Sequence, residues 1–356
     1  MKRALHSGIK SVLQLGMATV PRSVYTRLVP QDVIGLCYHT VSDEWPAHVA
    51  HICPFKSSTA FRDDMVWLTG NFEVIGYEEA CRRKSSVRRS RSPAVVVTVD
   101  DGYRECLTVI APILQELKIP AIFFVTTNFI DNRQLFYRNA ASLCIDALDR
   151  LGDSDQQATA RLITQSQRAT DADIPAIRQW LLDLGPENGS SLDATCRILG
   201  IDVEAFLKQR RPYLTRDEVR SLRSSGFTIG AHGTAHCHLA GLPHDHLEAE
   251  LAGSCHTIAE LTGDRSVPFA FPFSGHRVDR ASVTAIRARN PHVGLLFDSR
   301  GILPAEETTV HRISADTPPD DEASRRTVLP SLMQKSYESE LRQQWIAPLK
   351  SLLHVR

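Results

Sequence analysis

The sequence shows no excess of charge of either sign. Among its 356 residues, Lys plus Arg and Asp plus Glu each number 41, so the formal net charge at pH 7 is zero. Nucleic-acid-binding proteins concentrate positive charge to neutralise phosphates, and this balance gives no indication of such a partner. The Lys/Arg-rich stretch at 82–91 is local and precedes an apolar run, which is typical of a solvated loop. We therefore expect no nucleic-acid partner.

Paired cysteines are also missing. The eight cysteines are scattered along the chain, and no two of them form a CxxC pair. This spacing favours neither a zinc ribbon nor a disulfide framework, because both need cysteines at short, regular separations. We expect reduced thiols in a cytoplasmic protein.

The N-terminus lacks a long apolar run. Met1 to Arg3 is basic, but Lys10 and Gln14 interrupt the apolar residues that follow, so this stretch is too short and too polar for a signal peptide or a membrane span. Its apolar residues have helical spacing at Leu5, Ile9, Val12, Leu13 and Met17. We expect a helical segment over residues 1–30 that packs on the domain; a helix lying on a membrane face, as a peripheral contact, is the alternative.

Short apolar runs rich in β-branched and aromatic residues recur along the rest of the chain. They cover residues 33–38, 94–99, 121–126, 227–231, 268–271 and 293–297. Helical patterns separate most of them, for example at 61–68, 106–117 and 247–261, and this alternation predicts a parallel sheet or barrel. A polar, helix-prone stretch at about 131–211 interrupts the alternation and predicts a helical insertion. We expect one α/β domain over 31–316 and a helical tail over 317–356.

One apolar run ends in two adjacent carboxylates. The run Val95–Val99 is followed by Asp100, Asp101 and Gly102. Active sites of parallel α/β folds gather at the carboxyl ends of strands, where one carboxylate can bind a cation while its neighbour moves protons. Taken alone, the pattern is explained as well by an Asp-Gly turn or a helix cap.

A second apolar run ends in two histidines, His232 and His236, four residues apart. If this segment forms a helical turn, both imidazoles can face one ion. It is not the HExxH pattern of metalloproteases, because Gly233 stands where that pattern needs Glu. Six histidines fall between residues 232 and 256, so a chance pairing is the alternative.

The two stretches together indicate more than either does alone. One Asp and two His at strand ends make a two-histidine, one-carboxylate site that leaves positions open for water and substrate. A free carboxylate beside such a site is placed to act as a general base.

These residues resemble the polysaccharide deacetylases of carbohydrate esterase family 4. That family has a TFDDG-type motif, an H-(S/T)-x-x-H motif and a motif of the type R-x-P-(Y/F)-G or A-(Y/F)-P-(Y/F)-G, in this order. The matching segments here are Thr98–Gly102, His232–His236 and Phe269–Gly275. Further similar segments are Leu36–His39, Pro120–Val125 and Pro212–Thr215. The resemblance covers about 33–313 without the insertion, and it implies a distorted (β/α) barrel with fewer than eight strands.

The resemblance also implies the roles of the site residues. Asp100 would be the general base, and Asp101, His232 and His236 would bind one divalent metal ion, for which we expect Zn²⁺. The backbone N–H of Phe273 would help to hold the developing oxyanion.

The general acid that protonates the leaving amine is expected to be His39, with His311 as the competitor. A buried core histidine with no catalytic role is the alternative explanation for each of them. Tyr38, Phe273 and Arg312 are assigned to substrate binding.

Three positions depart from the family pattern. Gly233 replaces the usual Ser or Thr, which predicts weaker support of the histidine loop. Ala270 stands where many members have an arginine that orients the base, and Arg312 is the candidate to replace that arginine. Ser274 is inserted between Phe273 and Gly275, which puts the geometry of that loop in question.

We therefore expect an enzyme that removes N-acetyl groups from an amino-sugar poly- or oligosaccharide, or from a lipid- or nucleotide-linked glycan intermediate, in exopolysaccharide biosynthesis. Hydrolysis of a non-sugar amide on the same fold is one alternative. The other is a carbohydrate-binding protein that keeps the fold without turnover. The sequence does not indicate an oligomeric state.

Overall fold

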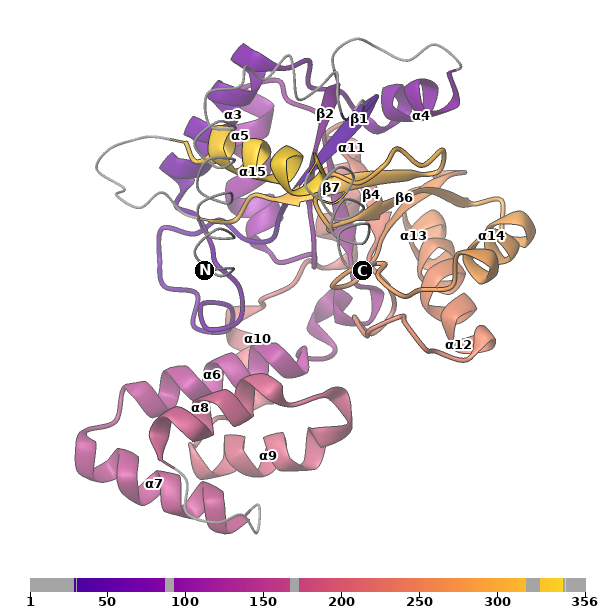
Figure 1. The fold of residues 1–356 in the computed structure, drawn as a ribbon. Coiled ribbons are helices and arrows are strands. Elements are labelled where there is room, and N and C mark those ends of the chain that lie inside the picture. Colours follow the sequence, from indigo (N-terminus) through magenta and orange to yellow (C-terminus); the bar gives the residue numbers. More distant parts are fainter. Residues whose placement is uncertain are drawn as a thin grey trace, which may run out of the picture.

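A closed barrel of seven parallel strands, in the order β1 to β7, forms the centre of the protein (Figure 1). The computed structural model describes residues 29, 31–86, 93–166, 173–317, 327–341 and 343. The strands are β1 (Val33–Tyr38), β2 (Ala94–Val99), β3 (Ala121–Val125), β4 (Thr228–Ala231), β5 (Val267–Ala270), β6 (Val293–Asp298) and β7 (Thr309–Ser314). β7 pairs with β1 and closes the barrel. The prediction of a distorted (β/α) barrel with fewer than eight strands is confirmed.

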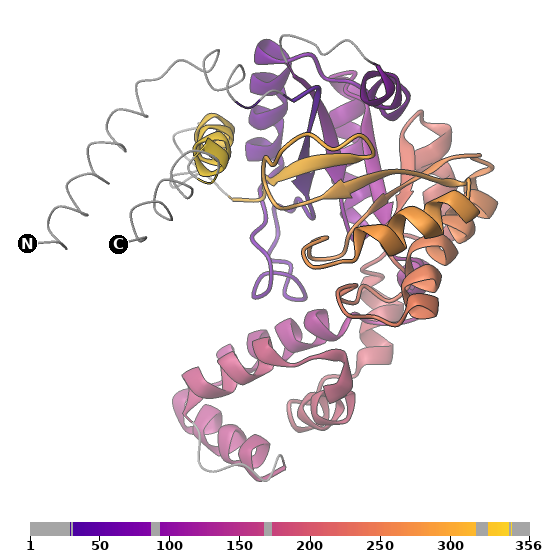
Figure 2. The ribbon, with the colours of Figure 1, turned by 45° about the vertical axis from the view of Figure 1, so that its right-hand side comes forward.

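Helices connect the strands and cover the outside of the barrel (Figure 2). They are α3 (Ser58–Asn71), α4 (Tyr77–Ser85), η1 (Cys106–Ile110), α5 (Ala111–Glu116), η2 (Thr127–Asn132), α11 (Arg216–Ser224), α12 (His244–Glu248), η4 (Ala249–Gly253), α13 (Ser254–Thr262), α14 (Arg280–Arg289) and α15 (Leu329–Leu341). No helix among the described residues is long and apolar enough to cross a membrane.

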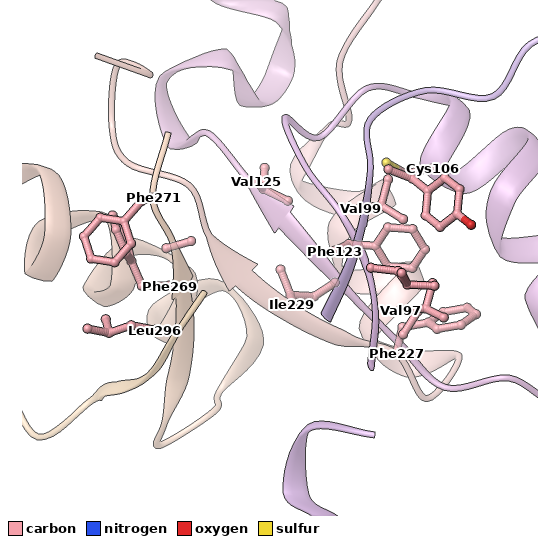
Figure 3. Packing of buried hydrophobic residues seen from close by; sticks show 14 of the residues in the cluster. Val97, Val99, Cys106, Phe123, Val125, Phe227, Ile229, Phe269, Phe271 and Leu296 are labelled. Carbon is pink, nitrogen blue, oxygen red and sulfur yellow. The ribbon is translucent and has the colours of Figure 1, made fainter. Parts of the chain in front are cut away.

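Alternate residues of each strand face opposite sides, which divides the core into two parts. Val97 and Val99 of β2 belong to the cluster between the strands and the surrounding helices (Figure 3). Phe123 and Phe227 pack edge to face in this layer, with ring centroids 5.1 Å apart. Val96, Phe124 and Phe297, by contrast, belong to a smaller cluster inside the barrel. The same alternation decides which polar side chains point inward at the carboxyl ends.

Five helices between β3 and β4 form a separate helical layer below the barrel (Figures 1 and 2). They are α6 (Tyr137–Asp149), α7 (Asp153–Ser166), α8 (Ile174–Asp183), α9 (Gly189–Ile198) and α10 (Val203–Arg210), with the short η3 (Pro186–Asn188) before α9. This segment has a hydrophobic cluster of its own, built from residues such as Cys144, Leu148, Ile177 and Leu181. An independent apolar core explains how a polar, helix-prone sequence folds beside the barrel.

The predicted N-terminal helical segment at 1–30 lies outside the described residues, apart from Val29. Of the predicted C-terminal tail at 317–356, the structure describes residues 317, 327–341 and 343, and α15 occupies 329–341. The helix α15 packs on the barrel through buried residues such as Leu329, Met333 and Tyr337.

Candidate active site

A cavity of about 220 Å³ opens at the carboxyl ends of the strands. Its lining includes His39 after β1, Asp100 and Asp101 after β2, His232 and His236 after β4, and Phe273 after β5. Asp100 and Asp101 directly follow the last residue of β2, as His232 follows β4. The structure therefore brings together the base, the three metal ligands and the preferred acid that the sequence predicted.

Asp101, His232 and His236 form a compact cluster of possible metal ligands. The Oδ1 atom of Asp101 lies 3.4 Å from Nε2 of His232 and 3.1 Å from Nε2 of His236. The histidine segment does not form the helical turn that the i, i+4 spacing suggested. Instead, Gly233 at φ 75° and His236 at φ 53° turn the backbone sharply, so that both imidazoles face the same carboxylate.

The charges and hydrogen bonds of these three residues suit a divalent cation. The Nδ1 atom of His232 lies 2.9 Å from the carbonyl oxygen of Ala270, which fixes the ring so that the lone pair of Nε2 faces Asp101. Burial holds the pKa of His236 below its ordinary value, which keeps that imidazole neutral. Burial by itself would raise the pKa of Asp101, but His236 and His232 outweigh it and hold that pKa well below the usual range. Among the described residues, the buried Oδ1 atom of Asp101 makes no hydrogen bond.

The carboxylate of Glu250, on η4, holds the loop between the two histidines. Its Oε2 atom accepts hydrogen bonds from the backbone N–H of Thr234 (2.7 Å) and of Ala235 (3.3 Å), and its Oε1 atom accepts from the hydroxyl of Thr234. A Cβ atom at Gly233 would lie 2.7 Å from Oε2 of Glu250, so glycine makes room for this carboxylate. The loop therefore has no side-chain hydroxyl at position 233, and the carboxylate of Glu250 supports it instead.

Replacing Glu250 by alanine should weaken metal binding by about 10–100-fold, because supporting residues of a metal site contribute affinity of that order. Metal affinity measured by competition with a chelator tests this expectation. Glu260→Ala is the control, since Glu260 lies on α13 with an exposed partner, His256. An unchanged affinity in Glu250→Ala would mean that the loop keeps its shape without the carboxylate.

Arg312 of β7 holds the predicted base, Asp100. Its guanidinium donates to both carboxylate oxygens, with distances of 2.6 Å to Oδ1 and 2.8 Å to Oδ2, and also to the hydroxyl of Thr98 (3.0 Å). A Cβ atom at Gly35 would lie 2.5 Å from Cγ of Arg312, so Gly35 leaves the space that the arginine occupies. Burial would raise the pKa of Asp100, but Arg312 and His232 outweigh it and keep that pKa below its ordinary value.

His39 has the setting expected of a general acid, whereas His311 does not line the cavity. Asp316 accepts from the backbone N–H of His39 (2.9 Å), and its Oδ2 atom lies 2.7 Å from Nδ1 of the ring. Burial lowers the pKa of His39, but Cys53 and Asp316 outweigh it and hold the pKa well above its ordinary value. His311 is buried on the face of β7 opposite Arg312, and its Nε2 atom lies 3.1 Å from the carbonyl oxygen of Pro304.

Two of the three residues assigned to substrate binding do not line the cavity. Tyr38 faces outward from β1, where its ring packs edge to face against Phe61 and its hydroxyl donates to Asp64 (2.9 Å). Arg312 is completely buried beneath Asp100. Strand alternation explains the position of Tyr38, which follows the inward-facing Cys37, whereas Arg312 faces inward and is covered by Asp100. Phe273 does line the cavity, and the centroid of its ring lies 4.9 Å from that of the His236 ring.

The inserted Ser274 does not displace this loop from the cavity. Gly275 donates its backbone N–H to Asp298 at the end of β6 (2.8 Å), and Phe273 adopts a left-handed conformation with φ 58°. The role of the Phe273 N–H toward an oxyanion stays a prediction.

The helical insertion supports one wall of the cavity. Residues of α6 hold the loop at 45–53: Asn139 donates to the carbonyl oxygen of His48 (2.7 Å), and Ser142 donates to that of Ala47 (2.7 Å). This loop carries Ile52 and Cys53, which line the cavity. The sequence alone does not indicate what the insertion contacts.

The sequence motifs did not identify three residues of the site: Asp316, Cys53 and Glu250. Each lies outside the quoted motifs and reaches the site through long-range packing. Period-two alternation along β7 offered a partial signal for Asp316, because it places Arg312, Ser314 and Asp316 on one face.

Comparisons with known proteins agree with this geometry. A family model described as polysaccharide deacetylase matches residues 88–288, which is more than half of the chain. No curated protein sequence matches the chain. Among solved structures, the deacetylase PplD of Streptococcus pyogenes in complex with acetate has a TM-score of 0.51 at 15% identity, covering 80% of this chain and 92% of that one. IcaB of Ammonifex degensii has a TM-score of 0.49 at 15% identity, covering 86% and 98%.

At this identity the likeness to PplD supports the fold alone, and the family assignment depends on the match over residues 88–288 together with the site. The chain belongs to the polysaccharide deacetylase family, enzymes that hydrolyse amide bonds and remove acetyl groups from sugar nitrogens.

Proposed function

We propose that this protein removes N-acetyl groups from the amino sugars of a poly- or oligosaccharide, with one divalent cation held by Asp101, His232 and His236. The observation that carries the proposal is the convergence of this cluster of two imidazoles and one carboxylate with a separate buried carboxylate, Asp100, in one cavity. Zn²⁺ is the proposed ion, because two imidazoles and one carboxylate are ligands that it accepts with a position left open.

A cation at this position would polarise the acetamide carbonyl and make water more acidic. Asp100 takes up the proton of the attacking water, and its lowered pKa keeps it ionised and ready to accept that proton at neutral pH. Arg312 fixes the orientation of the carboxylate through both of its oxygens. His39, held by Asp316, donates a proton to the sugar nitrogen as the C–N bond breaks. Its raised pKa keeps it protonated until that step.

The experiment combines metal analysis with acetate release from acetylated chito-oligosaccharides, for wild type, Asp101→Ala and His232→Ala. We expect about one equivalent of metal in wild type, and loss of both metal and acetate release in the variants, because two remaining ligands hold zinc poorly. Circular dichroism checks that each variant is folded.

The control is Asp279→Ala, which removes an exposed helix cap that does not line the cavity and should leave metal content and turnover unchanged. Metal without acetate release from any acetylated sugar would contradict the substrate class. A wild-type protein that binds no metal would contradict the proposed chemistry.

A further inference from the structure

A second set of side chains with donor atoms close enough to hold a metal ion lies beside the first. The imidazole of His39, the thiol of Cys53 and the carboxylate of Asp316 each offer one donor atom, and these atoms all lie within 4.8 Å of one another. None of the three belongs to the Asp101, His232 and His236 cluster. Both His39 and Cys53 line the same cavity, so a solvated ion that enters the cavity reaches them.

The donor types suit a thiophilic divalent ion. Zinc is bound by cysteine sulfur at about 2.3 Å and by histidine nitrogen at about 2.0–2.1 Å, in tetrahedral geometry. Donor atoms of such a site are therefore roughly 3.5 Å apart. The donor atoms of His39, Cys53 and Asp316 lie within 4.8 Å of one another, so small side-chain movements bring them to this separation. The Nδ1 atom of His39 and the Oδ2 atom of Asp316 lie 2.7 Å apart, so an ion bound to both atoms would replace their hydrogen bond.

The protein holds Cys53 in a defined position, so its thiol is not a freely exposed surface thiol. It is half-buried, and it follows the loop that Asn139 and Ser142 of α6 hold in place. Cys37 offers a useful contrast: it is fully buried on β1, and its thiol lies 3.3 Å from Oδ2 of Asp100. Cys37, His39 and Asp100 also lie close enough to share an ion, but both oxygens of Asp100 are paired with the guanidinium of Arg312, whose positive charge opposes a cation there.

We propose that His39, Cys53 and Asp316 form a second, inhibitory binding site for zinc-like ions. An ion there occupies the imidazole that must carry the proton for the leaving amine, so turnover stops while the first ion stays bound. The inhibitory effect depends on the proposed role of His39 as general acid; the binding itself does not.

Binding is tested with Cd²⁺, whose bond to a thiolate gives an ultraviolet charge-transfer absorption that nitrogen and oxygen ligands do not give. Wild type, Cys53→Ser and Cys37→Ser are titrated after loading with one equivalent of zinc. We expect a saturable absorption of about one Cd²⁺ per chain in wild type and in Cys37→Ser, and its loss in Cys53→Ser. His39→Gln should weaken the binding at least about tenfold.

Inhibition is tested with excess Zn²⁺ on acetate release. The inhibition of each variant is expressed relative to its own turnover without added Zn²⁺, and on this scale Cys53→Ser should need at least about tenfold more Zn²⁺ for half inhibition than wild type or Cys37→Ser. An equal absorption in wild type and Cys53→Ser would overturn the site. Equal inhibition of the two would overturn its inhibitory role. If no acetylated sugar is hydrolysed but the Cys53-dependent absorption appears, the proposed function fails and the metal site stands.

Discussion

Replacing Arg312 by methionine should lower the free energy of unfolding by about 3–5 kcal/mol and reduce turnover by at least about a hundredfold. Methionine has a similar length and no charge, so the substitution leaves the carboxylate of Asp100 buried without its bidentate partner. A buried charge that loses its counter-ion costs far more than the ion pair itself contributes. Without Arg312, the pKa of Asp100 should rise, because burial then acts on it with less opposition.

Chemical denaturation and acetate release measure the two effects. The matched control is Arg62→Met, which breaks an exposed ion pair with Glu116 and should change stability by less than about 1 kcal/mol. The double variant Arg312→Met/Asp100→Asn removes both charges and should regain part of the lost stability, yet stay inactive. If the double variant is no more stable than Arg312→Met, the destabilisation comes from packing around Gly35 and not from the unpaired carboxylate.

This ion pair shows how far the sequence could predict the site. The motifs identified Asp100, Asp101, His232 and His236 because each stands at the end of an apolar run, and parallel strands bring their carboxyl ends together. The missing arginine at Ala270 pointed to a substitute, and β7 supplies it across the barrel. The sequence also predicted substrate contacts for Tyr38 and Arg312, but Tyr38 lies on the outer face of its strand and Arg312 is buried beneath Asp100.

The remaining parts of the site depend on contacts between segments far apart in the sequence. Glu250 reaches the histidine loop from the next helical segment, and α6 holds the loop that carries Cys53. No local pattern encodes such contacts: a glutamate in a helix is ordinarily a solvated residue. Periodicity predicted the insertion as helical, but the partner of each of its faces is set by packing, which a single sequence does not display.

Replacing Asp316 by asparagine should shift the basic limb of the pH profile of kcat/KM to lower pH by about 1–3 units. The general acid works only while it is protonated, so activity falls as the pH rises through the pKa of His39. In wild type, burial lowers that pKa, but Cys53 and Asp316 together hold it well above the ordinary value. Asparagine keeps the shape and one hydrogen bond of Asp316 and removes its charge. The pKa of His39 therefore falls, and the protonated form is lost at a lower pH.

The pH dependence separates this effect from a loss of structure, because a variant that is only less stable loses activity without moving the limb. His39→Gln should remove the basic limb and reduce turnover by about 10²–10⁴-fold. The double variant His39→Gln/Asp316→Asn should be no slower than His39→Gln alone, since Asp316 acts through the imidazole. An unshifted limb in Asp316→Asn, with the fold intact, would assign the acid to another group, and an additive loss in the double variant would give Asp316 a role apart from His39.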